Sequence, residues 1–126
     1  MDTKLYLTIA GIVAIVFGIG FVLIPATLLL LYGEAATPGA VLNIQFFGSS
    51  LIGVGVISWF ARDARDSMTL RAVLTGLLIG DVVGLGVNLW GTFSGVLNAL
   101  AWSTTLLYVL LIAGAAYCLS NMRKPA

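Results

Sequence analysis

Long apolar runs separated by short polar connections dominate the pattern of this chain. Four runs are each long enough to cross the roughly 30 Å hydrocarbon core of a bilayer as a helix. We place these spans at about 5–31, with a break at Pro25, and at 40–60, 70–90 and 96–119. The pattern predicts an all-α fold, namely an integral membrane four-helix bundle of up-down topology.

The first run is too long for one straight span, since residues 5–32 would measure about 42 Å as a single helix. Pro25 removes one backbone donor, which favours a kink or a short interfacial turn after it. The remaining connections are short, so residues 1–126 form a single domain.

Composition agrees with lipid as the solvent, because 60% of the residues are hydrophobic and only 9% are charged. The net charge of +1 and the lack of a basic stripe argue against nucleic acid as a partner. The chain has no histidine and one cysteine, Cys118, so the usual metal and haem ligands and the commonest general base are missing. We therefore expect no metal and no cofactor, and the shortage of reactive groups disfavours an enzyme.

The six basic residues predict the orientation of the chain. An even number of spans puts all of them on one side, and the positive-inside rule makes that side the cytoplasm. Both termini are then cytoplasmic in a multi-pass inner-membrane protein. The basic residues are Lys4, Arg62, Arg65, Arg71, Arg123 and Lys124.

Small residues recur at helical spacing and predict close helix contacts. Gly76, Gly80 and Gly84 follow one face of the third span. The other candidates for helix packing are Gly18, Gly48 and Gly55. These contacts lie either inside one bundle or on a surface for a partner subunit.

Asp81 is the acid near the middle of the third span, about 16 Å past Leu70 at 1.5 Å per residue. A charged carboxylate at this depth costs on the order of 2.5–3.5 kcal/mol, so we expect the neutral acid with hydrogen-bond partners on neighbouring spans. Asp81 is either a proton, cation or ligand site or a structural hydrogen-bonding group. Its candidate partners are Ser49, Ser50, Thr104, Thr105 and Tyr108.

Four amides are expected in the outer half of the membrane: Asn43, Gln45, Asn88 and Asn98. If they converge, they form a polar vestibule that leads toward Asp81 and suits the headgroup of a lipid or a quinone-like molecule. The alternative is that each amide caps or cross-links helix ends.

A wider pattern of aromatic residues, glycines and one proline resembles a known family. It comprises Phe17-Gly18, Phe21, Pro25, Leu31-Tyr32-Gly33, Phe47-Gly48, Leu51, Gly53, Gly55, Trp59 and Ala61-Arg62. These residues resemble small bacterial four-transmembrane-helix proteins classed as a domain of unknown function, loosely DoxX-like. The resemblance implies a bacterial inner membrane and a role beside quinone or redox enzymes, with no catalytic residues to carry over.

Three functions are compatible with these features, and the one they favour least is an enzyme of lipid or quinone metabolism with Asp81 and Tyr108 as its central pair. The one they favour most is a non-catalytic accessory or structural subunit of a larger membrane complex or a small homo-oligomer, with membrane lipids and other transmembrane helices as partners. The alternative is a small proton-coupled carrier, or a binder of a lipid-like or quinone-like ligand, that uses Asp81.

Overall fold

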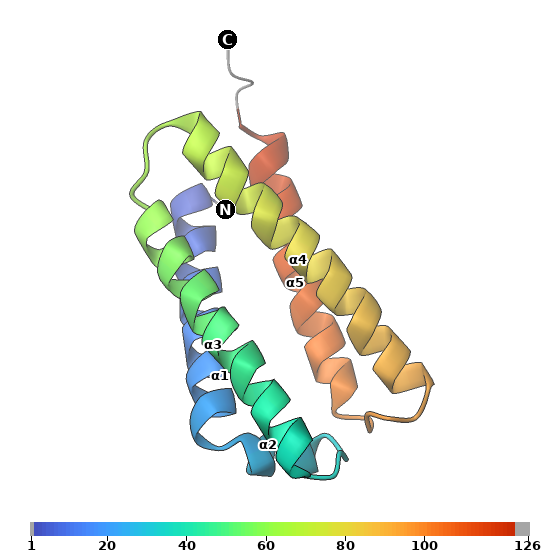
Figure 1. Cartoon of the computed structure of the whole chain (residues 1–126). Helices are drawn as coiled ribbons and strands as arrows, with labels where there is room; N and C mark the ends of the chain where they lie inside the picture. Colours follow the sequence, from blue (N-terminus) through green and yellow to red (C-terminus); the bar gives the residue numbers. More distant parts are fainter. Residues whose placement is uncertain (1, 123–126) are drawn as a thin grey trace.

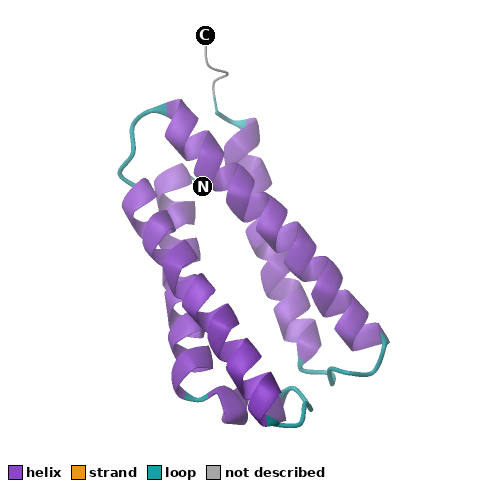
Figure 2. Cartoon of the chain, in the orientation of Figure 1, coloured by secondary structure: helices purple, strands orange, loops and turns teal. Residues whose placement is uncertain are grey.

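Five helices form the regular structure of residues 2–122, the part of the chain that the computed structural model describes (Figure 2). They are α1 Thr3–Leu23, α2 Pro25–Leu31, α3 Pro38–Ala61, α4 Ser67–Phe93 and α5 Ala101–Ser120. Four of them, α1, α3, α4 and α5, are long and apolar enough to cross a membrane. The all-α class is thus confirmed, and the four candidate spans indicate a multi-pass membrane protein.

The break at Pro25 separates two helices. Ile24, with φ −130° and ψ 51°, ends α1, and Pro25 begins the seven-residue α2. Proline suits this first position because its missing N–H would have no partner inside the helix there. The short helix α2 therefore forms the turn from α1 toward α3.

The connection between α4 and α5 is longer than the sequence predicts. The last span was expected to begin near residue 96, but α5 begins at Ala101. Asn98 explains the difference, because its backbone N–H donates to the Tyr32 carbonyl at 3.0 Å and its side chain donates to the Leu31 carbonyl at 2.9 Å. These bonds tie the connection to the end of α2.

The long helices pack as two antiparallel pairs (Figure 1). The first hairpin consists of α1 and α3 and the second of α4 and α5, with extensive contact within each pair and little between them. The pairs meet where α1 begins and α5 ends, and they diverge toward α2 (Figure 1). The divergence therefore leaves room between the hairpins toward α2, although the hydrogen bonds of Asn98 and a bond between Tyr32 and Thr104 still link the end of α2 to the second hairpin.

Backbone contact between glycines holds the first hairpin together. A Cβ on Gly18 would lie 2.7 Å from the Gly48 carbonyl oxygen, and a Cβ on Gly48 would lie 2.8 Å from the Gly18 oxygen. A Cβ on Gly55 would likewise lie 2.9 Å from the Gly11 carbonyl oxygen. Only residues without a side chain let two helices approach so closely.

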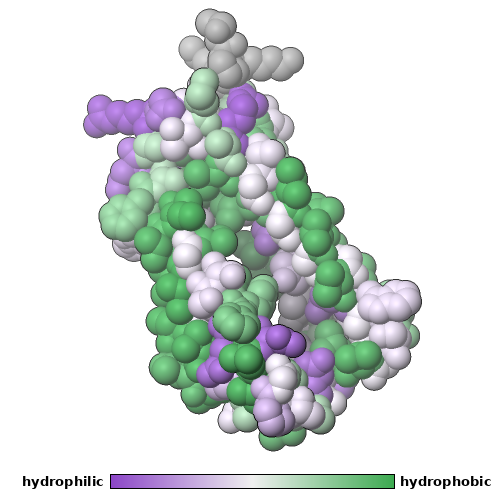
Figure 3. Space-filling view, viewed as in Figure 1, coloured by the Kyte–Doolittle hydropathy of each residue, from purple (hydrophilic) through white to green (hydrophobic). Residues whose placement is uncertain are grey.

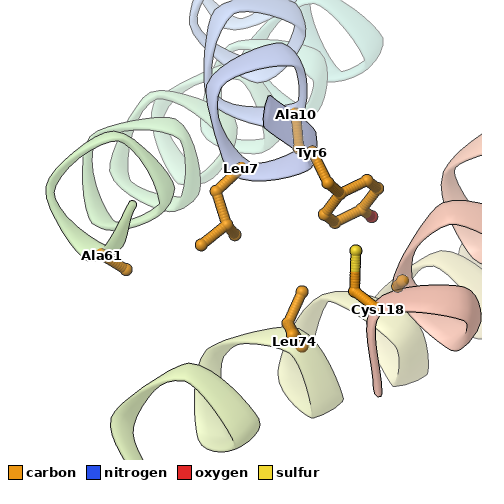
Figure 4. Packing of buried hydrophobic residues seen from close by; sticks show 7 residues of the cluster. Tyr6, Leu7, Ala10, Ala61, Leu74 and Cys118 are labelled. Atoms are coloured by element: carbon orange, nitrogen blue, oxygen red, sulfur yellow. The ribbon is translucent and has the colours of Figure 1, made fainter. Parts of the chain in front are cut away.

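A buried cluster joins the two hairpins at their closed end (Figure 4). Leu7 and Leu74, from opposite hairpins, are fully buried in it. The Tyr6 hydroxyl also donates to the Leu111 carbonyl on α5 at 2.9 Å. The cluster consists of Tyr6, Leu7, Ala10, Ala61, Leu74, Ala115 and Cys118. Every long helix contributes, so this cluster fixes the end from which the hairpins diverge.

Large apolar side chains cover the outside of both hairpins. Phe60 and Met68 are each 73% exposed and Val87 is 67% exposed. An apolar surface of this extent on every long helix would aggregate in water, whereas hydrocarbon solvates it.

Asp66 caps α4 and makes the stability of that helix depend on pH. Hydrogen bonds from the side chain and the backbone N–H of Thr69 hold the pKa of Asp66 below its ordinary value of 3.8. A carboxyl with a lowered pKa in the folded state stabilises fully above its ordinary pKa, and this contribution is lost as pH falls through the lower folded value. We expect the melting temperature of the wild type to fall over this acidic range.

Asp66→Ser is the matched variant, because serine caps a helix without titrating. Thermal melts of both proteins across acidic pH should therefore converge as the pH falls. A constant difference between the two melting temperatures would contradict a titrating cap.

Candidate functional site

Three adjoining hollows lie between the two hairpins, and we call them together the interhelical cleft. The side hollow, of about 460 Å³, lies between α3 and α4, and the inner hollow, of about 120 Å³, is bounded by all four long helices. The α2-end hollow has about 400 Å³. Phe47 and Tyr108 border all three. Figure 3 shows this face of the molecule hollowed between the hairpins.

Asp81 and Tyr108 bring the polar chemistry of the cleft together. Asp81, on α4, borders both the side hollow and the inner hollow, and Tyr108 reaches it from α5. The Tyr108 ring packs on Gly84, where a Cβ would lie only 2.7 Å from the ring and its hydroxyl. Gly84 is about one helical turn after Asp81, so its missing side chain lets the phenol approach the region of the carboxyl.

Neither of these two groups has a hydrogen-bond partner within residues 2–122. The expected partners of Asp81 bond elsewhere: Ser49 and Ser50 donate to the Phe46 carbonyl, Thr104 pairs with the Tyr32 hydroxyl at 2.6 Å, and Thr105 pairs with Asn88. None of the expected hydrogen bonds from neighbouring spans to the Asp81 carboxyl is present within this part of the chain. Asp81 and Tyr108 both face the cleft with their bonding capacity unused by the described residues.

Gln45, Asn88 and Asn98 do not converge on one vestibule. Gln45 donates to the Val22 carbonyl on α1 at 3.1 Å, and Asn98 ties the connection to α2. Asn88 donates to the Ala101 carbonyl at 3.2 Å and to the Thr105 hydroxyl at 2.7 Å. Each amide therefore cross-links a different pair of segments, and of the three only Asn88 borders the cleft, in its α2-end hollow.

Two further predictions need correction. Ser49 is exposed and lies outside the cleft, whereas its neighbour Ser50 borders the side hollow. Gly76 and Gly80 also border that hollow, and a Cβ on either would meet no described atom within 4 Å. These two glycines make no helix contact inside the described chain; they widen the cleft along α4.

Aromatic residues form a part of the site that sequence reasoning missed. Phe47 borders every hollow, and its ring lies 5.5 Å from that of Phe21, which lies 6.1 Å from that of Phe17. The spacing of four residues between Phe17 and Phe21 was the one available signal, because it puts both rings on one face of a helix. Nothing in the sequence pairs that face with Phe47.

The polar groups of the side and inner hollows that lack a partner among the described residues are one carboxyl and one phenol. A carboxyl can accept hydrogen bonds or pair with a cation, and a phenol can donate or accept one hydrogen bond. Within residues 2–122, no three His, Cys, Asp or Glu side chains lie close enough together to hold a metal ion. The geometry is thus a mostly apolar chamber whose lining includes these two polar groups.

Comparisons with protein-family models, with curated proteins and with solved structures found no significant match to this chain. The resemblance to DoxX-like proteins therefore stays a prediction.

Proposed function

We propose that this chain is a non-catalytic multi-pass membrane protein that binds one lipid-like or quinone-like molecule between its two hairpins. The observation that carries the proposal is the interhelical cleft, with the unpartnered groups of Asp81 and Tyr108 inside it. The apolar part of the ligand lies along α3 and α4, and its polar head lies against these two groups.

The dimensions and walls of the cleft support this assignment. Ligand sites are mostly apolar cavities of about 300–1,000 Å³ with a few well-placed polar groups, and the side hollow of about 460 Å³ falls in that range. Its walls come from α3 and α4, the two helices of neighbouring hairpins that make little contact with each other. A molecule dissolved in the bilayer can enter between them without crossing water.

The charge pattern supports an orientation with both termini in the cytoplasm, and the DoxX-like resemblance supports a bacterial inner membrane. The start of α1 lies beside the α3–α4 connection, where Lys4 pairs with Asp63 at 3.3 Å. Arg62 and Arg65 belong to this same end. The positive-inside rule then makes this end cytoplasmic, so the wide end of the cleft faces the other leaflet.

Gly80→Leu is the variant that tests ligand binding. A leucine side chain there enters the side hollow, because the glycine has open space where a Cβ would be. Purified protein is irradiated with a long-chain alcohol that carries a diazirine, and labelled peptides are mapped by mass spectrometry. We expect labels on α3 and α4 of the wild type and a loss of about tenfold in Gly80→Leu, equivalent to about 1.4 kcal/mol of binding.

Gly53→Leu is the matched control, since Gly53 also has open space but lies outside the cleft. Its labelling should equal that of the wild type. Equal labelling of the wild type and Gly80→Leu, or labels spread evenly over all lipid-facing helices, would contradict a ligand site in the cleft.

An accessory subunit of a larger complex is the second candidate function. The observation that favours it is the uncovered backbone at Gly76 and Gly80, where a helix from a partner can approach α4 closely. Extraction in mild detergent then retains a stoichiometric partner in the wild type, and Gly80→Leu releases it. A wild-type protein that carries lipid and no second polypeptide argues against this candidate.

A further inference from the structure

Aromatic residues line the inner hollow together with Asp81. Asp81 is the acid that borders this small chamber of about 120 Å³. The rings that border it come from α1, α3, α5 and the end of α2, and they belong to Phe17, Phe21, Tyr32, Phe47 and Tyr108. The faces of aromatic rings carry negative electrostatic potential and attract cations, most strongly where water is excluded.

The charge of the cleft has one sign. Among the described residues that border the three hollows, the charged types are Asp81 and Glu34, with no lysine or arginine. Asp81 lies at the boundary of the side and inner hollows, and Glu34 borders the α2-end hollow. A carboxylate removed from water without a counterion is costly, and a cation that arrives with the ligand offsets that cost.

The alternatives for the head of the ligand fit less well. A quinone or an acidic lipid presents oxygen acceptors, and a carboxyl can donate to them only while it is protonated. With Asp81 deprotonated, the Tyr108 hydroxyl is the donor that remains in the side and inner hollows. Its side chain makes no other hydrogen bond among the described residues. An ammonium, by contrast, pairs with Asp81 and contacts ring faces at the same time.

We propose that the molecule held in the cleft is a lipophilic amine, with its ammonium group beside Asp81 among the aromatic rings and its alkyl chain along the side hollow. This inference rests on the proposed function and specifies its ligand class. The inner hollow holds the head and the side hollow, nearly four times larger by volume, holds the chain.

Competition between two detergent-like probes tests the charge of the head. Dodecyltrimethylammonium and dodecyldimethylamine oxide share a chain and nearly share a head shape, but at neutral pH only the first carries a net charge. Each is titrated against labelling by the photoreactive alcohol, with the whole protein in micelles of an uncharged glycoside detergent. We expect the ammonium to halve labelling at roughly one tenth of the concentration of the amine oxide.

Three variants identify the source of the preference. Asp81→Asn should remove the preference for the ammonium over the amine oxide. Phe47→Leu, which keeps an apolar side chain but removes the ring, should reduce that preference. Asp63→Asn should preserve it, because Asp63 is an exposed carboxyl that pairs with Lys4 at the cytoplasmic end. Thermal melts accompany each variant, so that the Phe47 and Asp63 variants decide the question even if Asp81→Asn is unfolded.

The outcomes separate this inference from the proposed function. Equal potency of the two probes, with cleft labelling that Gly80→Leu still removes, leaves a ligand site but overturns the amine. A preference for the ammonium probe that persists in folded Asp81→Asn, or persists undiminished in Phe47→Leu where Asp81→Asn is unfolded, also overturns it. Absence of cleft labelling in the wild type overturns the proposed function and the inference together.

Discussion

Replacing Gly18 with leucine is expected to separate α1 from α3 and to destabilise the first hairpin by about 3 kcal/mol. The new Cβ would lie 2.7 Å from the Gly48 carbonyl oxygen and 2.7 Å from the Ile52 side chain. One of these neighbours is backbone, so the clash is relieved only if the helices move apart. Reversible unfolding in mixed micelles, followed by circular dichroism, measures the loss.

Gly53→Leu is again the control, because a Cβ at Gly53 meets no described atom within 4 Å. Its free energy of unfolding should remain within about 0.5 kcal/mol of the wild type, as for other surface substitutions. A Gly18→Leu protein as stable as Gly53→Leu would show that the two backbones are not in contact.

The helices were largely predictable because backbone groups in hydrocarbon must be satisfied inside each segment. Long apolar runs therefore predict helices regardless of tertiary detail, and Pro25 predicts where the first run breaks. The start of the last helix was not predictable in this way. It depends on Asn98, whose bonds to Leu31 and Tyr32 join segments 67 and 66 residues apart.

The candidate site was predictable only at the level of individual residues. Asp81 stands out because a lone acid in an apolar run is costly, and Tyr108 follows from its expected depth. The choice between Ser49 and Ser50 depends on the rotation of α3, since neighbouring residues point about 100° apart. That rotation is set by the contacts of Gly48 and Gly55 with α1, which the sequence does not specify.

The divergence of the hairpins could not be predicted from the sequence either. Gly76, Gly80 and Gly84 repeat at one spacing, so the pattern treats them alike. In the structure Gly84 contacts Tyr108, whereas Gly76 and Gly80 border open space. Glycine therefore allows close packing at position 84 and borders the open cleft at positions 76 and 80. The difference depends on where the two hairpins diverge.

Replacing Asp81 with leucine is expected to stabilise the protein while it abolishes ligand binding. No described residue bonds to the carboxyl, so leucine removes a desolvated polar group without orphaning a partner. We expect the free energy of unfolding to rise by about 2 kcal/mol, close to the cost of an acid at mid-membrane depth. Labelling of the cleft by the photoreactive alcohol should fall about tenfold or more. Such a trade-off is typical of binding sites, where a residue that serves function lowers the stability of the fold.

Asn88→Leu is the variant with which Asp81→Leu is compared. Asn88 also lies in α4 and is buried, but it bonds to the Ala101 carbonyl and the Thr105 hydroxyl. Its replacement should destabilise the second hairpin by about 1 kcal/mol, because the Thr105 hydroxyl loses its donor and the Ala101 carbonyl loses one of its donors. If Asp81→Leu raises the free energy of unfolding and Asn88→Leu lowers it, the first residue is a ligand-binding group and the second one joins helices. A loss of stability in Asp81→Leu as large as that in Asn88→Leu would instead make the carboxyl a structural group.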